Sequence, residues 1–122
     1  PDEKLERFLY ATKNIRFCTM VHSLFRKNLI KRFDIKTTFG ADFVLICYLL
    51  WFGNLRYVGN HKYSARFISN RQSTEVERVT ANANSYLSRH NFIQYQLDTF
   101  DSLYEGDLRM KNYLHHQIID QA

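Results

Sequence analysis

Residues 40–54, GADFVLICYLLWFGN, place one acidic residue at the start of an apolar run that a glycine closes. The run from Ala41 to Phe52 is too short to cross a bilayer and predicts a buried core helix. Asp42 suits the first turn of that helix, where a carboxylate accepts hydrogen bonds from free N–H groups. Gly53 predicts a left-handed stop after the last helical residue. The stretch therefore predicts a central helix with a carboxylate at its N-terminal end.

The composition favours helices in a chain of 122 residues, which is one domain or a fragment of one. Four glycines and one proline leave little room for the tight turns of a many-stranded sandwich. Because Pro1 rather than methionine comes first, we expect a fragment, a processed product or a trimmed chain. Cys18 and Cys47 lie far apart among apolar neighbours, which predicts buried, reduced thiols and no metal site.

Two kinds of periodicity divide the chain. Helical spacing of apolar residues predicts helices over residues 2–13, 42–52, 73–104 (as one helix or two) and 108–119, with a short helix or turn over 26–32. Alternation of apolar or β-branched residues with other side chains predicts extended segments over residues 15–24, 55–58 and 63–68.

These elements predict an α+β fold that is mainly helical. A short two- to three-stranded element would be packed by helices, and the C-terminal third would be helical. The change of pattern near Asn70 divides the single domain or fragment into a mixed α/β portion, residues 1–70, and a helical extension, residues 71–122.

Much of the formal net charge of +5 comes from one cluster of cations, namely Arg26, Lys27, Lys31, Arg32 and Lys36. Such a cluster attracts phosphates on nucleic acid, on an anionic lipid surface or on a nucleotide. The alternative interpretation is a solvated helix face that only keeps the protein soluble. The sequence leaves both interpretations open.

The middle of the chain, about residues 15–72, resembles the second half of family 2 glycosyltransferases. The resemblance follows the order of the segments HSLFRK at 22–27, FGAD at 39–42, WFGNLRYV at 51–58 and YSAR at 63–66. It implies the acceptor-side half of a GT-A type nucleotide-sugar transferase of surface polysaccharide synthesis. No Asp-x-Asp occurs in the sequence, so the resemblance implies a portion that is inactive alone.

The resemblance implies a role for particular residues. Asp42 matches the catalytic base, which takes the proton of the attacking acceptor hydroxyl. Arg66, with His61 nearby, matches a contact to the leaving diphosphate, and Trp51 could stack on a sugar. The ordinary alternatives are a helix cap for Asp42, a surface arginine for Arg66 and a core position for Trp51. A nucleotide-sugar donor and a divalent metal would be needed only in a full-length parent; we expect no cofactor for this chain alone.

A second hypothesis is a non-enzymatic helical interaction module. The aromatic residues of the C-terminal part, Tyr86, Phe92, Tyr95, Phe100 and Tyr104, could form a homo-oligomerisation or partner-docking surface. An acceptor glycan and peripheral membrane contact are further partner hypotheses. Nucleic-acid binding is disfavoured, because no recognition motif accompanies the basic cluster. We expect a cytoplasmic protein, with the inner face of the membrane as one location.

Overall fold

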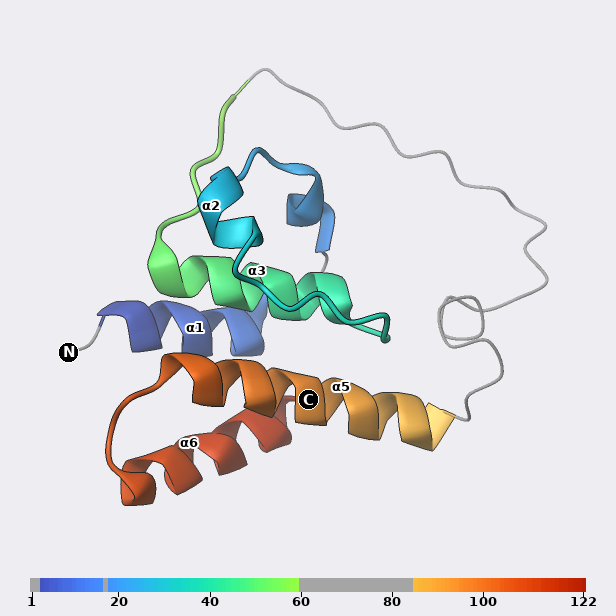
Figure 1. Cartoon of the computed structure of the whole chain (residues 1–122), viewed down its shortest axis with the longest axis vertical. Helices are drawn as coiled ribbons and strands as arrows, with labels where there is room; N and C mark the ends of the chain where they lie inside the picture. Colours follow the sequence, from blue (N-terminus) through green and yellow to red (C-terminus); the bar gives the residue numbers. More distant parts are fainter. Residues whose placement is uncertain (1–2, 17, 60–84) are drawn as a thin grey trace.

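The computed structural model describes residues 3–16, 18–59 and 85–122, and every regular element in these ranges is a helix (Figure 1). The elements in chain order are α1 (Glu3–Asn14), the 3₁₀ helix η1 (Cys18–His22), α2 (Lys27–Ile30), α3 (Ala41–Phe52), α5 (Ser85–Leu103) and α6 (Leu108–Gln121). None of the helices in these ranges combines the length and the apolarity that crossing a bilayer would require.

Helix α3 lies at the centre of the described structure. Its apolar residues surround the helix axis, so several of its sides must be covered by other elements. Helix α1 packs most extensively against it, and η1 and α5 contact it as well. In Figure 1, α3 lies between the pair η1 and α2 on one side and α5 and α6 on the other. The predicted buried core helix is thus confirmed.

The two ends of α3 are closed in different ways. Gly53 is extended, with φ −176° and ψ −178°, so the predicted left-handed stop there is wrong. The Arg7 side chain of α1 instead donates to the last carbonyls of α3, over 2.7 Å from Nε to Leu50 O and 3.2 Å from Nη2 to Trp51 O. At the other end, the N-cap residue Gly40 is the left-handed one, with φ 74°.

One cluster of the core joins α1, α3, α5 and α6. Phe8 and Phe100 are fully buried with ring centroids 5.5 Å apart, and the Trp51 ring meets Phe8 edge to face at 6.1 Å. Leu114 and Ile118 of α6 complete this cluster. A second cluster joins α3, α5 and the chain after α2, and it positions the candidate site described below.

The predicted strands are wrong where the structure describes them. The segment 15–24 contains the 3₁₀ helix η1, and residues 55–58 form no regular element, with Leu55, Tyr57 and Val58 exposed. A strand is stable only beside a hydrogen-bonded partner, and an alternating pattern does not supply one. The segment 63–68 lies outside the described residues. The described fold is therefore helical rather than α+β.

The other helices agree with the sequence pattern. Residues 2–13 and 108–119 correspond to α1 and α6, and α5 and α6 are separate helices, as the gap predicted between residues 104 and 108 requires. Asp107 is the N-cap of α6, and its Oδ1 accepts from the Met110 N–H over 3.0 Å. The proposed helix start at 73 lies outside the described residues.

Candidate functional site

The structure does not bring the described members of the predicted transferase site together. Asp42 is exposed in the first turn of α3, and its Oδ1 accepts from the Phe43 N–H over 2.8 Å. Trp51 lies at the opposite end of α3 with 6% of its surface exposed. His61 and Arg66 lie outside the described residues.

Trp51 agrees with its ordinary interpretation as a core residue. Asp42 does not agree with its own as the helix cap: Gly40 is the N-cap residue of α3 and no side chain caps this end, so Asp42 acts one step inside the first turn. The Asp42 carboxylate satisfies a free N–H of the first helical turn. The Trp51 ring lies in the core against Phe8, so neither face is open to a sugar. The transferase assignment stays a prediction.

The basic cluster lies on α2 and on the connector that follows it. All five cations of residues 26–36, here called the basic segment, are exposed. Helix α2 has only four residues, and its N-cap residue Arg26 makes no side-chain capping hydrogen bond. A helix this short is not stable by itself, so tertiary contacts must hold the basic segment in place.

Phe33 is the apolar anchor of the basic segment. Its side chain is buried between two tyrosines, with ring centroids 4.7 Å from Tyr48 of α3 and 5.9 Å from Tyr95 of α5. Such tilted aromatic pairs add to the free energy of simple burial. The anchor therefore joins the basic segment to two long helices at once.

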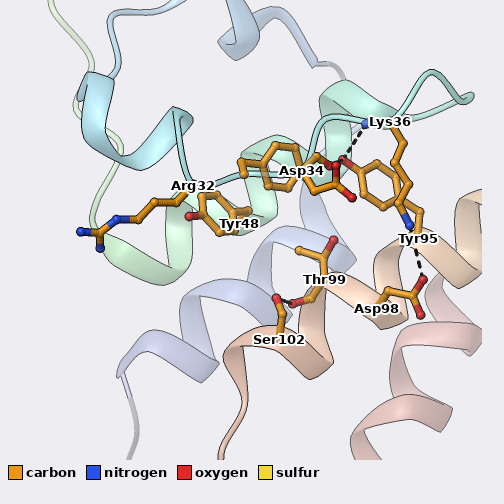
Figure 2. Close-up of a pocket in the computed structure, with 9 residues that line it drawn as sticks. Arg32, Asp34, Lys36, Tyr48, Tyr95, Asp98, Thr99 and Ser102 are labelled. Atoms are coloured by element: carbon orange, nitrogen blue, oxygen red, sulfur yellow. Dashed lines mark hydrogen bonds and ion pairs between the residues drawn. The ribbon is translucent and has the colours of Figure 1, made fainter.

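Both tyrosine hydroxyls bind the backbone of the basic segment. Tyr48 donates to Leu29 O over 3.3 Å, while Tyr95 donates to Asp34 O over 2.6 Å and accepts from the Lys36 N–H over 3.3 Å. Figure 2 shows the Tyr95 hydroxyl beside the Lys36 main chain. Polar groups of this short segment are thus satisfied by side chains from α3 and α5.

The surroundings of Tyr95 keep its hydroxyl protonated. Burial raises the pKa of Tyr95 above the ordinary tyrosine value of 10.0; the nearby Asp34 charge raises it further, and the hydrogen bond from Lys36 opposes both. The phenol therefore remains a donor at neutral pH. The Lys36 ammonium lies 5.1 Å from the Tyr95 ring centroid and 3.6 Å from Asp98 Oδ2.

A cavity of about 230 Å³ lies beside these anchors (Figure 2). Its lining residues are Arg32, Phe33, Asp34, Lys36, Tyr48, Tyr95, Asp98, Thr99 and Ser102. The lining contains two cations and two carboxylates, so their formal charges balance, and both tyrosine hydroxyls already donate to backbone carbonyls. No group of three His, Cys, Asp or Glu side chains in the described residues could hold a metal ion. The lining of the cavity therefore has no net formal charge, and both of its tyrosine protons are already engaged.

The tyrosine anchors were not predicted as part of a site. The sequence pattern placed Tyr95 and Phe100 on a docking surface, but Tyr95 is 4% exposed and Phe100 is fully buried. Phe92 and Tyr104 are half-buried against the core, and Tyr86 has no described side-chain position. A buried tyrosine needs a partner for its hydroxyl, which is the one signal that could have indicated an anchor.

Comparison with protein-family models, with curated proteins and with solved structures finds no match for this chain.

Proposed function

We propose that this chain is a non-enzymatic helical interaction module, which attaches to a polyanionic partner through the basic segment. The observation that supports this most is the anchoring of five exposed cations on a segment that could not hold its own shape. Residues 26–36 contain these five cations against a single carboxylate, Asp34. Phe33, Tyr48 and Tyr95 fix the backbone between the cations.

Fixed cations favour binding for two physical reasons. Clustered charges of one sign raise the local concentration of an oppositely charged partner and accelerate encounter. A backbone that is already ordered also loses less conformational entropy when it binds. Of the five cations, Lys36 is the one that pairs with a described carboxylate at 3.6 Å. The remaining cations of the basic segment are exposed and can face a partner.

An interaction role agrees better with the described geometry than catalysis does. The cavity beside the basic segment has balanced charges, and its tyrosine hydroxyls are engaged. Asp42 and Trp51 lie at opposite ends of α3. Homo-oligomerisation through the C-terminal helices stays a prediction, although Tyr95 and Phe100 already contribute to the core within one chain.

The test is retention on immobilised heparin, a polyanionic probe, in a salt gradient. The test variant replaces Lys27, Lys31 and Arg32 by glutamine, because all three are exposed and the described structure needs none of their charges for packing. We expect the wild-type protein to be retained at about 0.15 M salt and the test variant to elute much earlier. Circular dichroism checks that the helical fold is kept.

A matched control removes the same net charge elsewhere. Lys13, Arg89 and Arg109 are exposed on α1, α5 and α6, and their replacement by glutamine should change the elution only slightly. If both triple variants elute together, only net charge matters and the proposed surface is wrong. A wild-type protein that is not retained at all would contradict the proposal equally.

A further inference from the structure

Apolar side chains project into solvent beside the cations of the basic segment. Leu24, two residues before Arg26, is fully exposed, and Ile35, just before Lys36, is 62% exposed. These two side chains contribute no burial to the described core. A single exposed aliphatic side chain is ordinary on a protein surface, but several of them among cations fit a surface whose partner has both charged and apolar parts.

A second segment at the same end has the same composition. Residues 53–59 leave α3 and rise to the end of the longest axis where α2 lies (Figure 1). Leu55, Tyr57 and Val58 are exposed there, and Arg56 between them adds another exposed cation. Residues 33–36 run from α2 across α3 to α5, where Lys36 pairs with Asp98. The surface formed by residues 23–36 and 53–59 is here called the basic end.

We infer that the polyanionic partner of the basic end is an anionic lipid surface. This inference rests on the proposed function and names the class of its partner. A bilayer interface binds both kinds of exposed side chain favourably, because lipid phosphates attract the cations while aliphatic groups enter the boundary of the acyl chains. Nucleic acid would bind cations and stacking aromatic rings, but it would leave Leu24, Ile35 and Val58 without an apolar partner.

The opposite end of the molecule has the opposite charge. Helix α6 and the turn before it lie at the other end of the longest axis (Figure 1). Residues 101–121 contain four carboxylates, Asp101, Glu105, Asp107 and Asp120, against Arg109 and Lys111. An anionic surface repels this acidic end, so the two ends together orient the chain with the basic end on the lipid.

The experiment measures co-sedimentation with vesicles of phosphatidylcholine alone and of phosphatidylcholine with phosphatidylserine. We expect binding only to the vesicles that contain phosphatidylserine. The test variant replaces Leu24 and Ile35 by serine, and it should bind these vesicles about tenfold more weakly. The variant K27Q/K31Q/R32Q should lose roughly fivefold for each cation removed.

A matched pair of substitutions serves as the control. Leu108 and Ile119 are exposed at the acidic end, and replacing both by serine should leave vesicle binding unchanged. Leu24→Ser with Ile35→Ser should also leave heparin retention unchanged, because it removes no charge. That separation between the two assays distinguishes the lipid inference from the proposed function on which it rests.

Three results would overturn the inference. Vesicle binding that is insensitive to Leu24→Ser with Ile35→Ser would show that the apolar side chains do not enter the lipid. An equal loss in the Leu108→Ser with Ile119→Ser control would remove the assignment to the basic end. Retention on heparin or binding to a DNA duplex, with no binding to either vesicle, would leave the proposed function standing and make the partner a polyanion other than lipid.

Discussion

Replacing Tyr95 by phenylalanine removes one hydroxyl from the anchor of the basic segment and leaves the buried ring in place. The hydroxyl donates to Asp34 O over 2.6 Å and accepts from the Lys36 N–H over 3.3 Å. A net hydrogen bond of this kind contributes about 1 kcal/mol to stability. The second bond is longer and contributes less. Asp34 and Lys36 are both exposed, so water replaces part of what is lost.

We therefore expect Tyr95→Phe to lower the free energy of unfolding by about 1 kcal/mol, which corresponds to roughly 4 °C in melting temperature. Tyr95→Ala should cost about 3–5 kcal/mol, because it also removes the ring that packs on Phe33. Tyr57→Phe is the control, since Tyr57 is 85% exposed and the change should stay within about 0.5 kcal/mol.

Urea unfolding measures these differences. Trp51 is the single tryptophan and is buried, so its fluorescence follows the loss of the core. Hydrogen exchange at the Lys36 amide reports on the hydroxyl directly and should become faster in Tyr95→Phe. Unchanged stability, within about 0.3 kcal/mol, together with unchanged exchange at Lys36 would refute the idea that this hydroxyl fixes the basic segment.

The folded protein holds the Tyr95 proton more tightly than the unfolded chain, because the pKa of Tyr95 is raised in the fold. The resulting stability is fully present below pH 10.0 and is lost as the pH rises through the folded-state pKa. Urea titrations should therefore show that the free energy of unfolding falls less steeply above pH 10.0 in Tyr95→Phe than in wild type. Gly40→Ala should destabilise the protein by more than about 1 kcal/mol, because Gly40 has φ 74° and an added Cβ would collide with the Phe92 ring; a neutral result in thermal melting would contradict this. Asp107→Ala should cost about 1 kcal/mol through loss of the cap on the Met110 N–H, whereas Asp107→Asn should retain most of the stability in the same melt.

The sequence predicts the long helices well because their signals are local. The apolar run of α3 and the amphipathic spacing of α1 and α6 are visible within single windows of the chain. The strand predicted over residues 15–24 failed because an alternation of a few residues is too short a signal to exclude other backbone conformations, and the segment instead contains η1, which packs on α3. Whether a strand forms depends on a partner, and the described residues contain none.

The candidate site was predictable only in part. The charge of the basic segment is a property of consecutive residues and is visible in the sequence. Its anchoring is not visible there, because Lys36 and the Tyr95 hydroxyl that accepts from its N–H lie 59 positions apart in the chain. The first-turn role of Asp42 was predicted from spacing alone, while the capping of the other end of α3 by Arg7 of α1 joins residues 43 and 44 positions apart.

Helix α3 contacts both α1, which precedes it, and α5, which lies far later in the chain, and this order has a consequence for how the chain is made. During translation α1 and α3 can meet early, but residues 85–103 of α5 leave the ribosome only after α3 has been exposed for many further residues. Until then the side of α3 that α5 covers, with Val44 and Tyr48, remains open to water and to other nascent chains. We expect a polypeptide that stops at residue 59 to aggregate when the complete chain does not, which pelleting after cell-free synthesis measures. Equal solubility of both would show that the first half shields α3 by itself.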